Sequence, residues 1–155
     1  MQPSHIAWGA ALAALLHLPT MAQPQGTLEK VKASGAIVLG VREASAPLSY
    51  LLGSNQYVGY HVELCERIAK SLFPQAQVRY QAVTSQNRMP LVQNGTVDLE
   101  CGSTSNTASR KEQVDFANTT YITEARYAVK KSAGIESTEQ LAGRTIVTTT
   151  GTTLV

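Results

Sequence analysis

The chain has 155 residues, of which 43% are hydrophobic and 15% charged, and its 13 Lys and Arg against 11 Asp and Glu give a formal net charge of +2. A disordered chain is excluded, because disorder combines low hydrophobicity with high net charge. The net charge is too small for a typical nucleic-acid-binding protein, which has a strong excess of Lys and Arg. The sequence also has none of the heptads or short repeats of a fibrous protein. A globular protein that does not bind nucleic acid is therefore expected.

The first 22 residues contain no Asp, Glu, Lys or Arg. A short apolar run ends near Pro19, and small residues stand at positions −3 and −1 before Gln23. This pattern is typical of a secretory signal peptide cut after Ala22, which predicts a periplasmic mature chain. A membrane anchor or a buried N-terminal helix is the alternative, but the run is too short for a bilayer, and His17 interrupts its end.

Strand and helix patterns alternate after residue 22. Strand patterns lie at 36–42, 77–83, 97–101, 126–130 and 145–149. Helix patterns lie at 27–34, 89–94, 109–114 and 138–141, and a further helix follows a hairpin at 48–60 and ends at Phe73-Pro74. Such alternation predicts a parallel sheet with right-handed crossover connections. The expected fold class is α/β.

Two of these helices carry more detailed signals. Thr27 is expected to be the N-cap of the first helix, and Gly35 its C-cap. The helix before Phe73 has apolar residues at i, i+3, i+4 and i+7, which predicts one buried stripe. The stripe consists of Cys65, Ile68, Ala69 and Leu72.

Cys65 and Cys101 are the two cysteines of the chain. An oxidising compartment would allow a disulfide between them, but two small buried cysteines without a bond would fit the sequence equally well. After Ala22 the one histidine is His61, so the sequence offers no zinc-type ligand set. No metal or cofactor is expected.

Several segments, taken in order, closely resemble the exported amino-acid-binding proteins of ABC importers (solute-binding protein family 3), and within them the glutamate/aspartate-binding subgroup. These segments are Arg42-Glu43, Gly59-Tyr60, Thr84-Ser-Gln-Asn-Arg88, Leu91-Val-Gln-Asn-Gly95, Glu100-Cys-Gly-Ser-Thr104, Arg110 and Thr149-Thr-Gly-Thr-Thr153. The resemblance implies a periplasmic-binding-protein-like fold of two α/β lobes, with the ligand closed between them. Residues 23–129 would form lobe one without its return segment, and 130–155 the hinge and the start of lobe two. The chain is therefore expected to be an N-terminal fragment.

The resemblance also implies a set of ligand contacts. They are Arg42, Ser85, Arg88, Ser103, Ser105, Arg110, Thr152 and Thr153. Arg110, helped by Ser103 and Ser105, would bind the α-carboxylate of the ligand. In this sequence Ser105 stands where the subgroup often has threonine, which keeps the hydroxyl.

The other two arginines would face the side-chain carboxylate. Arg42 ends a predicted strand and Arg88 follows one, so both can reach one crevice together with Ser85. No acidic residue is expected among the three arginines. Each pair of guanidiniums would then repel by roughly 3 kcal/mol at about 6 Å and an effective dielectric near 20, and an empty site of this kind favours anions.

The expected function is capture of L-glutamate or L-aspartate by a monomer that delivers it to the membrane permease of an ABC importer. Two alternatives use the same fold, a dehydratase-type enzyme and the sensing ectodomain of a receptor. An enzyme would need a general acid or base in the crevice. His61 and Glu100 are the poor candidates that the sequence offers for this role.

Overall fold

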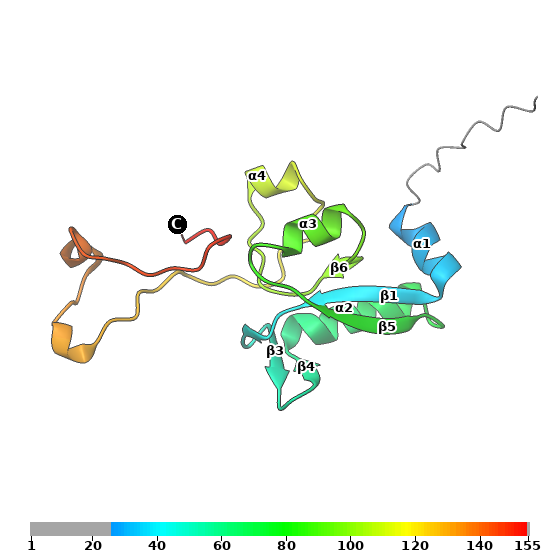
Figure 1. Ribbon diagram of the computed structural model, residues 1–155, viewed down its shortest axis with the longest axis horizontal. Helices are drawn as coiled ribbons and strands as arrows, with labels where there is room; N and C mark the ends of the chain where they lie inside the picture. Colours follow the sequence, from blue (N-terminus) through cyan, green and yellow to red (C-terminus); the bar gives the residue numbers. More distant parts are fainter. Residues whose placement is uncertain (1–25, 155) are drawn as a thin grey trace, which may run out of the picture.

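The computed structural model describes residues 26–154, so the predicted signal peptide lies outside the described residues. The central feature is a three-stranded parallel sheet in the order β5-β1-β6 (Figure 1). Its strands are β1 (Ala36–Val41), β5 (Gln77–Ala82) and β6 (Leu99–Glu100). All six residues of β1 pair with β5, and Leu39 and Gly40 pair with β6. The predicted parallel α/β sheet is confirmed.

A second, antiparallel sheet follows β1. It consists of β2 (Ala44–Ser45), β3 (Ser49–Leu52) and β4 (Gln56–Val58) in the order β2-β3-β4. β3 and β4 form the predicted hairpin, and β2 is a short additional strand that the sequence analysis did not anticipate.

Helices connect the strands. They are α1 (Thr27–Ser34), α2 (Tyr60–Leu72), α3 (Arg88–Gln93) and α4 (Ala108–Lys111), followed by the 3₁₀ turns η1 (Lys131–Ala133) and η2 (Thr138–Leu141). Gly26, not Thr27, is the N-cap of α1, because the helix begins one residue earlier than expected. Gly35 is the C-cap, with a left-handed φ of 65° and its N–H donating to the carbonyl of Val31.

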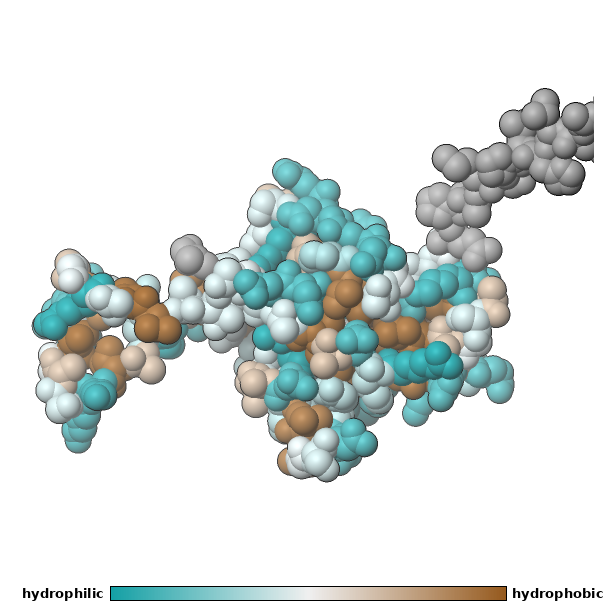
Figure 2. Space-filling model, in the orientation of Figure 1, coloured by the Kyte–Doolittle hydropathy of each residue, from teal (hydrophilic) through white to brown (hydrophobic). Residues whose placement is uncertain are grey.

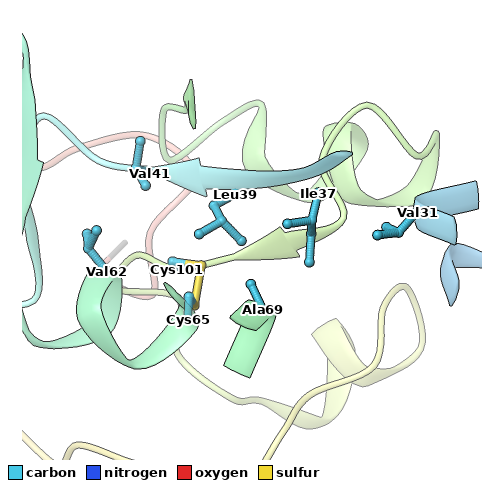
Figure 3. Packing of buried hydrophobic residues seen from close by; sticks show 8 residues of the cluster. All are labelled: Val31, Ile37, Leu39, Val41, Val62, Cys65, Ala69 and Cys101. Carbon is cyan, nitrogen blue, oxygen red and sulfur yellow. A yellow bond between two sulfur atoms is a disulfide. The ribbon is translucent and has the colours of Figure 1, made fainter. Parts of the chain in front are cut away.

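The hydrophobic core lies between α2 and the parallel sheet (Figure 3). It contains Val31, Ile37, Leu39, Val41, Val62, Cys65, Ala69 and Cys101. The expected stripe of α2 is partly wrong, because Ile68 and Leu72 are 38% and 59% exposed, whereas Val62 is buried. The buried face of α2 is therefore centred on Cys65, and it directs that side chain toward the end of β6.

Cys65 and Cys101 are joined by a disulfide in the structure. Their Cα atoms lie 6.1 Å apart, and the bond connects the middle of α2 to the residue that follows β6 (Figure 3). The segment beyond Cys101 therefore starts from a covalently fixed position.

Replacing both cysteines by serine should lower the free energy of unfolding by about 2–4 kcal/mol, because the bond constrains the long loop of the unfolded chain between the two residues. Denaturant unfolding of the parent chain and the double variant measures the difference. Thiol titration of the unfolded, non-reduced chain provides the control: no reactive thiol is expected, and two thiols per chain would refute the bond.

Asp98 fixes the position of β6. Its side chain is 1% exposed, and its carboxylate accepts from the backbone N–H of Val38 at 2.8 Å and from Nζ of Lys30 at 2.8 Å. One buried carboxylate thus joins α1, β1 and the turn before β6. Because its partners include a backbone donor and a cation, the cost of burying its charge is offset.

Residues 122–149 form an arm that extends away from the sheet and then returns (Figure 1, yellow to red). The predicted strands at 126–130 and 145–149 are wrong, since neither segment is a strand in the structure. A strand needs a neighbour to pair its backbone groups, and no described segment pairs with them. Ile122 and Val147 are 89% and 92% exposed, and Figure 2 shows hydrophobic side chains on the surface of this arm.

No helix among residues 26–154 has the length and apolar character that crossing a membrane requires.

Candidate functional site

Three arginines lie near the carboxyl ends of the parallel strands. Arg42 directly follows β1, Arg88 opens α3 after β5, and Arg110 lies in α4 after β6. In open α/β sheets this edge is where ligands bind, because the loops that follow the strands converge there. The arginines share this edge as the sequence analysis expected.

Arg88 and Arg110 converge on one oxygen atom. Nη2 of Arg110 donates to the carbonyl oxygen of Gly151 at 3.1 Å, and Nη2 of Arg88 lies 3.4 Å from the same oxygen. Gly151 has a φ of +79°, and a Cβ there would fall 2.7 Å from the carbonyl oxygen of Ser85. A glycine at this position therefore lets the returning segment approach both guanidiniums closely.

Arg42 is held at both its backbone and its side chain. Its backbone N–H donates to Oγ of Ser49, which is fully buried, at 2.8 Å. Its Nη1 donates to Oγ of Ser85 at 3.1 Å. Ser85 is 8% exposed, so Arg42 and Ser85 form a fixed pair beside the other two arginines.

Arg88 is an unusually buried cation. The residue is 3% exposed, and its Nε and Nη1 have no hydrogen-bond partner. Burial lowers the pKa of Arg88, Glu100 opposes this shift, and the positive charges of Arg110 and Arg42 add to it. A buried guanidinium with unused donors costs free energy until an acceptor arrives, so the site favours an anion.

The sequence predicts no acidic residue among the arginines, and this prediction is wrong, because Glu100 lies beside Arg88 and Arg42. The carboxyl group lies at the end of β6, and its Oε1 is buried without a partner. Burial raises the pKa of Glu100, whereas Thr104, Arg88, the Gly102 backbone and Arg42 lower it. With this carboxyl ionised, three guanidiniums and one carboxylate give the cluster a net charge of +2.

Gly102 lies where the side chains of Glu100 and Arg42 meet. A Cβ at this position would collide with Oε1 of Glu100 and would lie 2.7 Å from Cγ of Arg42. The absence of a side chain at Gly102 therefore allows the acid and the arginine to occupy the same side of the loop.

Gly102→Ala should weaken ligand binding about tenfold, because the new methyl group displaces Arg42, while the backbone at this position accepts alanine without left-handed strain. Calorimetric titration with L-glutamate, one of the two ligands that the sequence resemblance implies, measures the affinity, and a thermal melt checks that the variant is folded. Adding Glu100→Asp shortens the acid and should restore part of the affinity. If the affinity of Gly102→Ala stays within twofold of the parent, the close packing of Glu100 and Arg42 around Gly102 does not affect ligand binding.

The predicted hydroxyl contacts are distributed unevenly. Oγ of Ser105 lies 3.4 Å from Oγ1 of Thr153, and the carbonyl of Ser105 accepts from Nη1 of Arg110 at 3.1 Å. Ser103 donates instead to Ser45 at 3.3 Å, and Oγ1 of Thr152 donates to the carbonyl of Thr149 at 2.8 Å. The structure thus brings Ser105 to Arg110, with Thr153 beside Ser105, and engages Ser103 and Thr152 elsewhere.

Sequence reasoning missed Glu100 and Gly151 as members of the cluster. The sequence offers Glu100 as a poor candidate for a general acid or base, equally consistent with a structural role, because an acid at a strand end carries no specific signal. Gly151 lies within the Thr-rich segment 149–153, where the hydroxyl side chains are the groups that suggest ligand contacts. The group that contacts the arginines is instead the backbone carbonyl of Gly151.

A cavity of about 290 Å³ lies beside the cluster, between α2, α3 and the segment before the arm. Its walls include Arg88 and Glu100 but are mostly apolar, and neither Arg42 nor Arg110 lines it. The cavity therefore adjoins the arginine cluster through Arg88 but does not include Arg42 or Arg110. Among residues 26–154 no group of three or more His, Cys, Asp or Glu side chains could hold a metal ion.

A model of the family described as bacterial extracellular solute-binding proteins, family 3, matches residues 37–152. The chain belongs to this family. Its family 3 relatives include the L-glutamate/L-aspartate-binding protein of Pseudomonas aeruginosa, 46% identical over 93% of this chain and 50% of the relative. The glutamate/aspartate import solute-binding protein of Salmonella typhimurium is 41% identical over 91% of this chain and 49% of the relative. The chain thus spans about half the length of these curated relatives.

The solved structures agree with the family assignment. The cysteine-binding protein of Campylobacter jejuni superposes with a TM-score of 0.56 and 32% identity, over 61% of this chain and 38% of that protein. The family 3 chain therefore has the α/β fold of periplasmic binding proteins over the part that it covers. Each of these three similar proteins is named as a binding protein.

Proposed function

We propose that this chain belongs to an extracytoplasmic binding protein that captures L-glutamate or L-aspartate and delivers it to the permease of an ABC importer. The names of the two curated relatives support this ligand class. The family match supports a role in solute binding.

The observation that carries the proposal is the convergence of Arg88 and Arg110 on one oxygen, at 3.4 and 3.1 Å. In this structure the oxygen is the Gly151 carbonyl, which marks the place where ligand oxygens would meet the two guanidiniums. A carboxylate carries a full negative charge, so it would bind Arg110 more strongly than this carbonyl does. The unpartnered donors of Arg88, together with Arg42 and Ser85, would then be available to a second carboxylate.

Charge balance favours an acidic ligand. With Glu100 ionised, the net charge of +2 matches the two carboxylates of glutamate or aspartate, and the ammonium group of the ligand would need an acceptor outside this cluster. An amide in place of the side-chain carboxylate would leave one positive charge without compensation inside a buried site. We therefore assign Arg110 to the α-carboxylate, and Arg42 and Arg88 to the side-chain carboxylate, with Ser105 and Thr153 as the hydroxyl contacts. Ser103 and Thr152 would contact the ligand only after breaking their hydrogen bonds with Ser45 and Thr149.

The proposal extends to the organisation of the whole protein. Residues 1–22 would be a signal peptide cut after Ala22, which places the mature protein in the periplasm. Residues 23–129 would form lobe one, and 130–155 the hinge and the start of lobe two, in a monomer that closes around its ligand. The length of the relatives, about twice that of this chain, supports a second lobe.

We infer that the site binds its ligand without catalysis and is not that of a dehydratase-type enzyme. A dehydratase would need an acid or base free to exchange a proton with its substrate. Both ring nitrogens of His61 are engaged, with Gly102 at 2.6 Å and Thr120 at 2.9 Å. Burial raises the pKa of Glu100, and the charges of Arg88 and Arg42 act against this shift, so we assign Glu100 as a counter-ion of the arginines.

Calorimetric titration tests the proposal. L-glutamate, L-aspartate and L-glutamine are added to this chain and to an extended protein, in which the chain is continued by the part of the Pseudomonas aeruginosa relative that it does not cover. Binding of the two acidic ligands at least tenfold tighter than glutamine is expected in the extended protein. A folded extended protein that binds neither acidic ligand would refute the proposed function.

A further inference from the structure

Helix α2 holds two consecutive residues of the chain after β6. Cys65 is bonded to Cys101, and Nδ1 of His61 lies 2.6 Å from the carbonyl oxygen of Gly102. His61 and Cys65 are four residues apart, so they lie on one face of the helix, one turn from each other. The start of the loop 102–105, which we call the ligand loop, is therefore anchored by a covalent bond and a hydrogen bond from the same helix.

The second nitrogen of the His61 ring contacts a different segment. Because a carbonyl oxygen only accepts hydrogen bonds, Nδ1 must carry the proton that goes to Gly102. In the neutral ring Nε2 is then an acceptor, and the hydroxyl of Thr120 lies 2.9 Å from it. One imidazole thus donates to the ligand loop and accepts from the segment that leads into the arm.

Aromatic contacts hold the ring in this orientation. The ring of Tyr121 meets it edge-on with the centroids 6.5 Å apart, and Tyr60 lies at 5.2 Å on another side. Two hydrogen bonds and two aromatic neighbours leave the imidazole little rotational freedom. Its contacts with Gly102 and Thr120 are therefore set together.

We propose that His61 is a positioning residue that fixes the ligand loop and links it to Thr120, so that ligand contacts made by the loop are transmitted to the segment that leaves the sheet. This inference rests on the proposed function, because the loop carries Ser105 and precedes Arg110. His61 itself does not contact the ligand. Neither the sequence motifs nor the family match assigns it a role.

Two conservative variants separate the contacts of His61. Asparagine places its amide nitrogen close to the position of Nδ1, and glutamine places its amide nitrogen close to that of Nε2. In the extended protein, His61→Gln should weaken L-glutamate binding about tenfold, because the contact with Gly102 is lost. His61→Asn should change the affinity by less than threefold. His61→Phe keeps the aromatic packing and should resemble His61→Gln.

Hydrogen exchange distinguishes a residue that links two segments from one that only stabilises the fold, because only the first changes how the ligand affects exchange. L-glutamate should slow exchange of the amides at 119–121 in the parent, but not in His61→Asn or Thr120→Val, which lose the second contact. Combining these two substitutions should add nothing further. Affinities within twofold of the parent for both His61→Gln and His61→Phe would overturn the inference, as would ligand-dependent slowing that survives in Thr120→Val.

Failure of the proposed function is distinguishable from failure of this inference. If the parent protein does not bind L-glutamate, exchange in the free protein still tests the anchoring of the ligand loop. Faster exchange at 102–105 in His61→Gln than in His61→Asn would support it. Equal exchange in the two variants would overturn it.

Discussion

Arg110→Ala should weaken the binding of L-glutamate to the extended protein at least about 100-fold. Arg110 reaches the point of convergence with one nitrogen and the Ser105 carbonyl with another. Its loss would remove the charge-assisted contact that we propose with the α-carboxylate, which every amino-acid ligand carries, at a cost of about 3 kcal/mol. Affinity for L-aspartate and L-glutamine should fall by the same factor. Calorimetric titration with the three ligands measures all of these changes.

Two controls accompany this variant. Lys111→Ala removes a positive charge from the next, exposed residue of α4 and should leave the affinity within about twofold. Arg110→Lys keeps the charge but loses the planar fork of donors, and should recover only part of the affinity. If Lys111→Ala weakens binding as much as Arg110→Ala, general electrostatic attraction explains the effect, and the assigned contact with the α-carboxylate is wrong.

Arg88→Met should abolish the preference for acidic ligands over glutamine. The guanidinium of Arg88 is buried with two nitrogens unpartnered, so its interaction free energy depends on an incoming anion. Affinity for L-glutamate is expected to fall about 100-fold, whereas that for L-glutamine should fall much less, since an amide never satisfied the charge. The ratio of the two dissociation constants is the decisive measurement. An equal loss for both ligands would contradict the assigned role.

Removal of Arg88 also takes away a positive charge that stabilises the ionised carboxyl group of Glu100. Without this cation the pKa of Glu100 should rise further, because burial already raises it and Arg88 opposes that shift. The double variant Arg88→Met/Glu100→Gln removes both charges and serves as the folding control. Arg79→Met, an exposed arginine on β5, removes the same charge away from the cluster and should leave the selectivity unchanged.

Much of the fold followed from local patterns. Strand β1 is a β-branched run bounded by Gly35 and the loop before Pro47, and its parallel partners were separated by helical spacing. Patterns of this kind depend on residues close in sequence, so they predict elements well. The strands expected at 126–130 and 145–149 failed for the opposite reason. Strand formation depends on a partner, and local propensity cannot supply one.

The clustering of the arginine side chains was predictable, but their contact with the backbone was not. Positions at strand ends and the family resemblance both indicate that Arg42, Arg88 and Arg110 share one edge of the sheet, and the structure places them there. The contact of Arg88 and Arg110 with the Gly151 carbonyl was not predictable, because any residue has a carbonyl and only tertiary structure decides where it lies. Glu100 was misjudged for a related reason, since its importance depends on burial beside residues far away in sequence.

The Gly151 carbonyl is attached to the chain, and this gives it a thermodynamic role as an internal competitor. Any ligand that uses the same donors of Arg88 and Arg110 must displace it, so the free energy of the hydrogen bonds that this carbonyl makes with the arginines is subtracted from the free energy of binding. A carboxylate overcomes this competition because its hydrogen bonds with arginine are charge-assisted and roughly twice as strong as those of a neutral carbonyl. A neutral ligand gains nothing by the exchange, so we expect the returning segment to contribute to selectivity.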